Sequence, residues 1–238
     1  KGKTSRNFRE KLASKAFSLT AFYDSIIADW YNKKLGILFP ERKTFFGEKI
    51  NQLRYGENPH QKSSLYLSDL KYEKSNLEQL SGKDLSYNNY NDIFAGLDIL
   101  FSEKKLPCTV IIKHANPCGV ASSKSSFKSF INAQCSDPVS AFGGVVACNY
   151  KITKKVALEM NRTFFEVILA KGFDKPALKI LKKKKNMRVI DISNVEFRSD
   201  ITTKIYDSSF LLQEKDQTIF DKKKLKFVTK TKPTKNEI

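Results

Sequence analysis

The fold prediction depends most on the stretch of residues 108–120, which reads Cys-Thr-Val-Ile-Ile-Lys-His-Ala-Asn-Pro-Cys-Gly-Val. Its first part, Cys108–Ile112, is a short run of apolar and β-branched residues, which is typical of a buried strand. Its last part, Asn116–Gly119, carries strong turn residues and predicts a turn. Lys113 and His114 are therefore expected at a strand end, where α/β folds place ligands.

The adjacent Lys113 and His114 are candidate catalytic residues. Histidine is the side chain whose ordinary pKa lies near neutrality, so an imidazole is suited to general-base catalysis. A neighbouring ammonium offers a positive charge and hydrogen-bond donors. Taken by itself, the pair favours an ordinary strand end that merely reaches solvent, and it is the rest of the sequence that favours catalysis.

Strand-like and helix-like segments alternate on both sides of this stretch. The predicted strands are 64–67, 108–112, 145–148, 165–170 and 188–192. The predicted helices are 91–105, 124–134, 154–161 and 175–183. This alternation predicts an α/β layered fold with a largely parallel sheet.

The N-terminal segment has a different pattern. Between residues 5 and 33, apolar residues recur every three or four positions, which predicts one long amphipathic helix. Residues 33–43 contain Gly36 and Pro40 and are typical of a linker. A domain boundary is therefore predicted near residue 45.

The composition limits the classes of protein to consider. The chain has 238 residues with 40% hydrophobic content, enough for one or two domains with a core. Its net charge is +18, which raises nucleic acid or an anionic membrane as a partner. Most of the excess is scattered lysine, however, and the signatures of nucleic-acid modules are absent. A solvated basic surface is favoured, and a nucleic-acid-binding protein stays an alternative that rests on charge alone.

The sequence gives no indication of a membrane partner. It contains no apolar run of about 18 residues or more, and its start lacks the pattern of a signal peptide. A cytoplasmic protein is therefore predicted. Because the chain begins at Lys1 without an initiator Met, we expect it to be a fragment of a longer protein.

The cysteines argue against a metal site. Cys108, Cys118, Cys135 and Cys148 contain no C-x-x-C pair and are expected to be reduced thiols. His114 followed by Pro117-Cys118 is faintly similar to the zinc signature of nucleoside deaminases. That signature needs a second cysteine where this chain has Ala121, and a Glu two places after His114. No metal is therefore expected, and a zinc deaminase stays an alternative.

Four further polar features are candidates for ligand binding. Arg54–Gln61 places a guanidinium, which can grip a phosphate bidentately, in a loop with Gly and Pro. Ser86–Asn89 offers amide groups at a helix entrance. Ser136–Gly144 ends in a Gly pair before a strand, where a backbone can approach a ligand closely. Glu166 lies in an otherwise apolar predicted strand, and a buried carboxylate needs a partner.

Together these blocks resemble one family. Its members are bifunctional purine-biosynthesis proteins that combine phosphoribosylaminoimidazolecarboxamide (AICAR) formyltransferase with IMP cyclohydrolase. The matching blocks, in matching order, are Leu53–Gln61, Leu85–Asn89, Ile112–Val120 and Ser136–Ala147. The similarity extends to Leu12–Asp24, which looks like the last helix of the cyclohydrolase domain, and to Val228–Pro233.

The resemblance implies a domain organisation. Residues 1–44 are expected to hold that last helix and a linker. Residues 45–238 are expected to form the first of two cytidine-deaminase-like, zinc-free α/β subdomains of the formyltransferase. The second subdomain and the body of the cyclohydrolase domain would lie outside this chain. The family's formyltransferase site forms across a homodimer, so the fragment alone is expected to be inactive.

The resemblance also implies a reaction and a set of site residues. The formyl group passes from the co-substrate 10-formyltetrahydrofolate to AICAR, giving FAICAR and tetrahydrofolate, and the cyclohydrolase then closes FAICAR to IMP. The roles carried over are catalysis for Lys113 and His114 and substrate binding for Arg54, Tyr55, Asn88, Phe142, Gly143 and Glu166. One departure is Tyr206–Phe210, which stands where the family has a Gly pair before a strand. A catalytically silent module that binds an AICAR-like nucleotide is the alternative reading.

Overall fold

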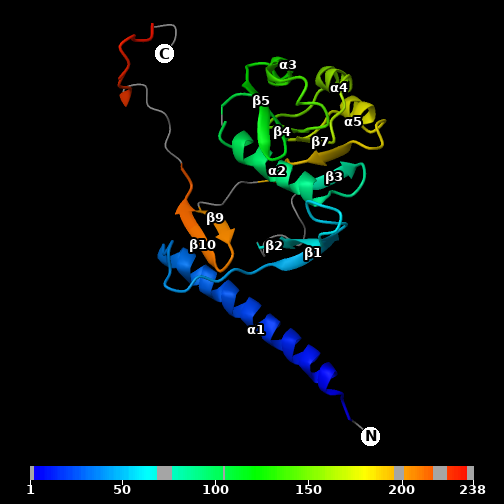
Figure 1. Ribbon diagram of the computed structural model, residues 1–238. Helices are drawn as coiled ribbons and strands as arrows, with labels where there is room; N and C mark the ends of the chain where they lie inside the picture. The colour runs from blue at the N-terminus through cyan, green and yellow to red at the C-terminus, as the bar shows by residue number, and fades with distance from the viewer. Residues whose placement is uncertain (1–2, 69–76, 104, 196–200, 217–223, 235–238) are drawn as a thin grey trace. The chain divides into compact units, whose positions relative to one another are not determined.

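The computed structural model describes residues 3–68, 77–103, 105–195, 201–216 and 224–234 (Figure 1). The chain divides into two compact units, Lys1–Glu196 and Phe197–Ile238. None of the described helices is long and apolar enough to cross a membrane. The domain boundary near residue 45 stays a prediction.

A six-stranded mixed sheet forms the centre of the first unit, in the order β3-β8-β7-β6-β4-β5. The bounds are β3 (Glu78–Ser81), β4 (Cys108–Lys113), β5 (Asn116–Ser122), β6 (Val145–Cys148), β7 (Val167–Ala170) and β8 (Arg188–Asp191). Strands β6, β7 and β8 are parallel. β4 is antiparallel to both of its neighbours, and β3 is antiparallel to β8. The α/β class is confirmed, but the prediction of a largely parallel sheet is wrong, because β4 and the two edge strands, β3 and β5, all run antiparallel to their neighbours.

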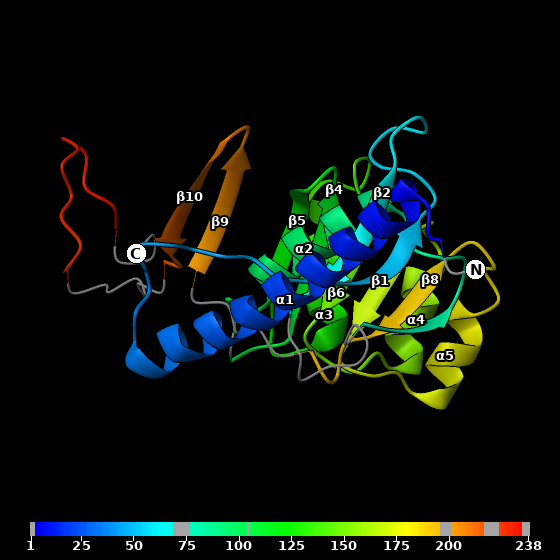
Figure 2. The ribbon, with the colours of Figure 1, turned by 90° about the horizontal axis from the view of Figure 1, so that it is seen from below.

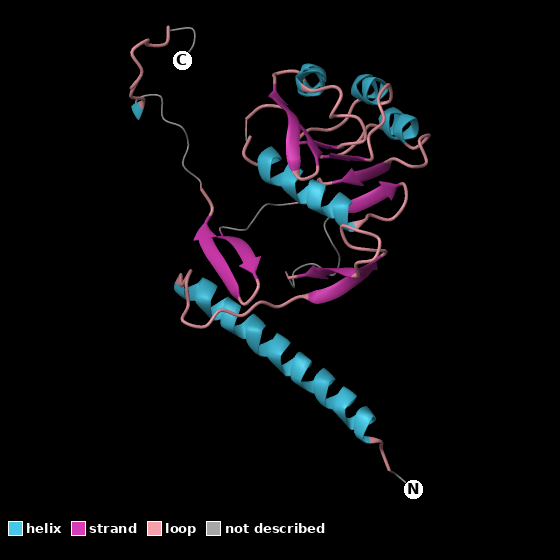
Figure 3. Ribbon diagram, in the orientation of Figure 1, coloured by secondary structure: helices cyan, strands magenta, loops and turns pink. Residues whose placement is uncertain are grey.

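Helices cover both faces of this sheet (Figure 3). The helices are α2 (Tyr87–Leu100), α3 (Ser126–Ser136), α4 (Lys154–Met160) and α5 (Lys175–Leu181). On β6, Val145 and Ala147 pack in the same cluster as α2, whereas Val146 and Cys148 pack with α3, α4 and α5. Alternate residues of a strand point to opposite faces, so β6 is buried on both sides. This is the arrangement that its continuous apolar run indicates.

The predicted strands and helices of the first unit are confirmed to within a few residues, except that α2 ends at Leu100 rather than at residue 105 and that two other element starts, both next to the site, differ. Helix α2 begins at Tyr87 rather than at residue 91, because Ser86 caps it. The Ser86 hydroxyl accepts from the Asn89 N–H, and the Asn89 side chain accepts from the Ser86 N–H, which forms a capping box. Strand β7 begins at Val167, so Glu166 precedes the strand instead of lying within it.

The predicted turn at Asn116–Gly119 is wrong. These residues begin β5, and the chain reverses one step earlier, at His114 and Ala115. β5 is an edge strand, and a bulge between Ile111 and Ile112 interrupts its pairing with β4. An edge strand with a bulge tolerates Pro117, whose missing N–H would disrupt a central strand.

The N-terminal helix and a hairpin complete the described part of the first unit. Helix α1 (Arg6–Leu35) confirms the predicted long helix and ends at Gly36, whose φ is 69°. Ser25 is its one buried residue, so the predicted apolar face, including Phe8 and Leu12, is exposed in this structure. Strands β1 (Glu48–Leu53) and β2 (Ser63–Leu67) pair antiparallel.

The second unit contains one described hairpin. Strands β9 (Ile201–Tyr206) and β10 (Ser209–Glu214) pair antiparallel (Figure 2). Asp207 has φ 49° in the turn. Asp is one of the few residues that tolerate this left-handed conformation, because its short side chain bonds to the local backbone. A hairpin turn therefore replaces the Gly pair that the family resemblance leads one to expect.

Candidate functional site

Lys113 and His114 lie at a strained turn. His114 and Ala115 are the two central residues of the β4–β5 loop, with φ 53° and 58°. Positive φ at both centres characterises type I′ hairpin loops, which favour Asn-Gly. A residue with a Cβ in this conformation costs on the order of 1 kcal/mol. Such strain persists only where neighbouring groups hold it, and it concentrates at functional positions.

Three hydrogen bonds hold this turn. The Ala115 N–H donates to Asp92 Oδ1 of helix α2 over 2.7 Å. The Asn116 side-chain amide donates to the His114 carbonyl over 2.9 Å. Lys113 Nζ donates to the Phe142 carbonyl over 2.8 Å, which takes one of its three N–H donors. The His114 side chain is exposed, and neither ring nitrogen bonds to another described residue, so the imidazole is free to act on a ligand.

The end of β4 meets the beginnings of three other strands. In register, Ile112 lies beside Val145 of β6, Val145 beside Val167 of β7, and Val167 beside Arg188 of β8. The residues just before these strands therefore gather at one end of the sheet, beside the last residues of β4. The parallel strands contribute their amino ends here, not the carboxyl ends that the general rule for α/β sheets favours. The reason is that β4 runs antiparallel to them.

The Gly pair packs against the backbone of β4. A Cβ on Gly144 would lie 2.9 Å from the Ile112 carbonyl oxygen and 3.1 Å from that of Ala141, so this approach favours glycine. The Gly143 N–H donates to the Phe164 carbonyl over 2.8 Å. The Phe142 side chain is 58% exposed, with its ring 5.7 Å from that of Phe164. The close backbone approach in the structure is to β4, and a close approach to a ligand stays a prediction.

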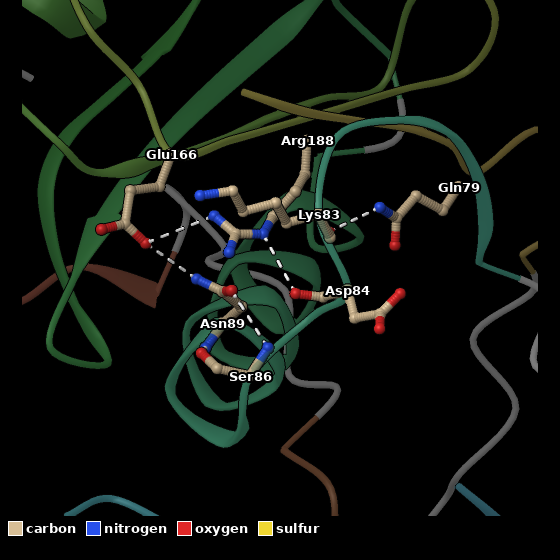
Figure 4. Close-up of polar contacts among 7 residues, drawn as sticks. All are labelled: Gln79, Lys83, Asp84, Ser86, Asn89, Glu166 and Arg188. Atoms are coloured by element: carbon tan, nitrogen blue, oxygen red, sulfur yellow. Dashed lines mark hydrogen bonds and ion pairs between the residues drawn. The ribbon is translucent and has the colours of Figure 1, made fainter. Parts of the chain in front are cut away.

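Glu166 is held by two side chains from other elements (Figure 4). Asn89 Nδ2 donates to Glu166 Oε2 over 3.0 Å, and Arg188 Nη1 lies 4.0 Å from the same oxygen. Arg188 Nε also donates to the Asp84 carbonyl over 3.4 Å. Glu166 has the partner that its position in the sequence requires, but its side chain is 46% exposed instead of buried. No described residue bonds to Oε1, so this oxygen is available to a ligand.

The Arg54–Gln61 loop closes on itself and touches helix α2. The Gly56 N–H donates to the Gln61 carbonyl, and the Asn58 N–H donates to Gln61 Oε1. Asn88 Nδ2 of α2 donates to the Glu57 carbonyl over 3.2 Å. The loop borders a shallow pocket of about 420 Å³ that is lined by Gly56, Glu57, Gln61, Lys62, Ser63 and Tyr87.

Arg54 and Tyr55 lie at the start of this loop. The Arg54 guanidinium carbon is 5.4 Å from the centre of the Tyr55 ring, which is cation–π geometry. The Tyr55 carbonyl accepts from the Ser63 hydroxyl over 2.6 Å. Among the described residues, no hydrogen bond or ion pair joins these two side chains to Lys113 or His114. The link to the rest of the site passes through Asn88 and α2.

Sequence reasoning missed Asp92 and Arg188 and left Asn89 without a role. Asn89 carries a local signal, because Ser86 and Asn89 have the spacing of a capping box. Arg188 carries a weaker one, since it is a lone arginine that opens an apolar strand. Asp92 lies on an amphipathic helix among other polar residues and carries none.

The cysteines do not form a metal centre in the described part of the chain. All four are free, and no three His, Cys, Asp or Glu side chains of the described residues lie close enough to share a metal ion. Cys118 Sγ donates to the Ile111 carbonyl over 3.5 Å. Partial burial raises the pKa of the Cys118 thiol, which opposes the thiolate form that a metal requires.

Comparison with known proteins identifies one family. The family described as the AICARFT/IMPCHase bienzyme matches residues 1–238. The bifunctional purine biosynthesis protein PurH of Thermoanaerobacter sp. (strain X514) is 43% identical over 238 residues, which are 100% of this chain and 46% of that protein. The PurH proteins of Bacillus cytotoxicus and Leptospira biflexa are each 39% identical, over 100% of this chain and 47% and 46% of their own lengths. The chain thus spans about half the length of the curated relatives it matches.

Proposed function

The chain belongs to the AICARFT/IMPCHase bienzyme family, and from this membership we propose that it supplies part of the AICAR formyltransferase of a purine-biosynthesis enzyme. The reaction moves a formyl group from 10-formyltetrahydrofolate to the 5-amino group of AICAR, giving FAICAR and tetrahydrofolate. The observation that carries the proposal is the strained turn, which holds an exposed His114 beside Lys113 at one end of the sheet. Glu166, whose Oε1 is available to a ligand, lies at the same end of the sheet.

His114 acts as the general base in this proposal. The amine of AICAR is conjugated to an aromatic ring that also carries a carboxamide, so it is a poor nucleophile. Removal of its proton during attack on the formyl carbon therefore speeds the reaction. The neutral imidazole accepts this proton, and its exposure on the turn leaves it accessible to the amine.

Lys113 assists at the tetrahedral adduct. Negative charge develops on the former formyl oxygen, and the departing folate nitrogen needs a proton. An ammonium can stabilise the oxyanion or supply that proton. The hydrogen bond from Lys113 Nζ to the Phe142 carbonyl fixes the ammonium and leaves two N–H donors for the substrates.

The remaining site residues bind AICAR. Arg54 contacts the ribotide together with Tyr55, because a guanidinium matches the geometry of a phosphate. Asn88 helps to hold the ribotide from the start of α2. Phe142 and Gly143 contact the substrate beside Lys113, and Glu166 offers Oε1 to an N–H donor of the substrate.

Replacement of Arg54 by Ala is expected to raise the KM for AICAR by about tenfold or more, because a charge-assisted contact to the phosphate is lost. The value of kcat should change by less than about threefold, since the contact is equal in ground and transition states. Arg162→Ala is a matched control, because Arg162 is exposed and, within the described part of the chain, forms an ion pair with Glu159 alone. Steady-state kinetics measure both variants in the full-length protein. An unchanged KM in Arg54→Ala would remove Arg54 from the phosphate site.

The proposal includes an assembly larger than this chain. We assign residues 45–238 to the first of two cytidine-deaminase-like subdomains and residues 1–44 to the end of the cyclohydrolase domain. The second subdomain completes the folate side, and the site forms across a homodimer. The cyclohydrolase domain of the same protein then closes FAICAR to IMP. The isolated chain is therefore expected to be inactive, and a cytoplasmic location stays a prediction.

The test is formyl transfer by the full-length protein whose reading frame contains this chain, with 10-formyltetrahydrofolate and AICAR as substrates. Absorbance reports tetrahydrofolate formation, and chromatography identifies FAICAR or IMP. The proposal predicts turnover that depends on both substrates. A folded, dimeric protein that binds AICAR but produces no tetrahydrofolate would favour the silent nucleotide-binding module instead.

A further inference from the structure

Helix α2 sends two neighbouring side chains to two different parts of the site. Asn89 and Asp92 are three positions apart, so they lie one above the other on the same face of the helix. Asn89 Nδ2 donates to Glu166 Oε2, in front of β7. Asp92 Oδ1 accepts from Ala115 N–H, in the β4–β5 turn.

We propose that α2 sets the distance between the base and the carboxylate of the site, with Asp92 as the positioning residue for His114 and Asn89 as the positioning residue for Glu166. This inference rests on the formyltransferase function proposed above. It assigns the two residues to different kinetic steps. Asp92 affects the chemical step through the turn, and Asn89 affects AICAR binding through the carboxylate.

The case for Asp92 rests on the strain in the turn. His114 and Ala115 both have positive φ, and the direction of the imidazole follows from this backbone conformation. A carboxylate that accepts from a backbone N–H over 2.7 Å makes a charge-assisted bond, roughly twice as strong as a neutral one. When this bond is absent, Ala115 is free to relax to negative φ, which reorients His114. A displacement of the base of about 1 Å is enough to cost 10²-fold in rate.

The case for Asn89 rests on how Glu166 is held. Asn89 is almost fully buried, with 3% exposure of the whole residue, and its side chain directs Nδ2 at Glu166 Oε2 (Figure 4). Arg188 Nη1 lies 4.0 Å from the same oxygen. Both partners therefore fix Oε2 and leave Oε1 for the substrate. Without Asn89 the half-exposed carboxylate rotates more freely, and its bond to AICAR weakens in the ground state and transition state alike.

Helix α2 is rigid enough to serve as this spacer. Ile93 and Leu100 are fully buried and Leu97 nearly so, all in one cluster with the strands of the sheet. The capping box fixes the first turn of the helix, next to Asn89. Movement of either polar side chain relative to the sheet would require repacking of this cluster.

The experiment measures kcat and the KM for AICAR in variants of the full-length protein. Asp92→Ala is expected to lower kcat about 10- to 100-fold while KM stays within about threefold. Asp92→Asn keeps an oxygen that accepts the Ala115 N–H and should recover most of the kcat. Asn89→Ala is expected to raise KM about tenfold while kcat stays within about threefold.

Two control variants separate positioning from general destabilisation. Asn91→Ala changes an exposed residue of the same helix turn and should leave both constants unchanged. Ser86→Ala breaks the capping box, as Asn89→Ala also does, but keeps the bond between Asn89 and Glu166. Ser86→Ala should therefore lower thermal stability like Asn89→Ala without raising KM.

Amide hydrogen exchange gives a readout that does not depend on activity. Asp92→Ala should accelerate exchange at the Ala115 N–H more than tenfold, while Asp92→Asn should not. An active parent in which Asp92→Ala and Asn89→Ala change kcat and KM together, or not at all, overturns the inference and leaves the proposed function standing. An inactive parent overturns the proposed function, and unchanged Ala115 exchange in Asp92→Ala then overturns the role of Asp92 separately.

Discussion

His114→Ala is expected to lower kcat for formyl transfer by about 10²- to 10⁴-fold, which is the usual contribution of a general base. The KM for AICAR should stay within about threefold, because the imidazole bonds to no described residue and serves the transition state. The effect should exceed that of any of the positioning variants, since these move the base without removing it. Single-turnover kinetics with the full-length protein measure the chemical step directly.

Two observations make this result specific. The φ of His114 is positive, and the neighbouring Ala115 already adopts the same conformation, so the turn should persist in the variant. Calorimetric binding of AICAR checks that the pocket is intact. Added imidazole should restore part of the lost rate by replacing the missing base. Equal kcat in variant and parent would return the Lys113-His114 pair to an ordinary strand end.

Gly119→Ala is expected to destabilise the first unit by about 3 kcal/mol or more, at or above the upper end of the usual range for overpacking. Gly119 is buried in β5, where the strand crosses helix α3. A Cβ at this position would lie 1.9 Å from the Ala133 carbonyl oxygen and 2.8 Å from its carbon. Both are backbone atoms, so no flexible side chain can move away, and strand and helix must separate.

Val120→Ala is the matched control for this substitution. Val120 is the next residue of β5 and is 44% exposed, so its truncation removes little packing. Urea unfolding monitored by circular dichroism should show that Val120→Ala lowers the free energy of unfolding by less than about 1 kcal/mol. Similar unfolding midpoints for the two variants would show that β5 and α3 are not in close contact in solution.

The sequence predicted the elements better than their connections. The apolar runs of β4, β6, β7 and β8 identify strands because burial on both faces requires such runs. The direction of β4 was missed, because strand direction depends on pairing between distant segments and leaves no local pattern. The turn was placed at Asn116–Gly119 by residue preference. Pairing across the edge strand overrides that preference, and the reversal falls on His114 and Ala115.

The site shows the same division between local and distant information. The segments that carry Lys113, Arg54 and Gly143 are recognisable because each is an unusual run of residues. The bond between Asn89 and Glu166 joins residues 77 positions apart, and neither residue indicates the other. The sequence predicted that Glu166 needs a partner, and the structure identifies Asn89 and Arg188 as that partner pair.

The strand order of the central sheet has a consequence for synthesis on the ribosome. Strand β3 (residues 78–81) lies beside β8 (residues 188–191), which is the last strand of that sheet to be made. The His114 turn and its Asp92 support are only 23 positions apart, whereas Arg188 reaches back 104 positions to Asp84. Contacts between distant segments form late, because a long loop must close first. A nascent chain can therefore form the His114 turn well before Arg188 is present to contact Glu166, and β3 stays unpaired until β8 emerges.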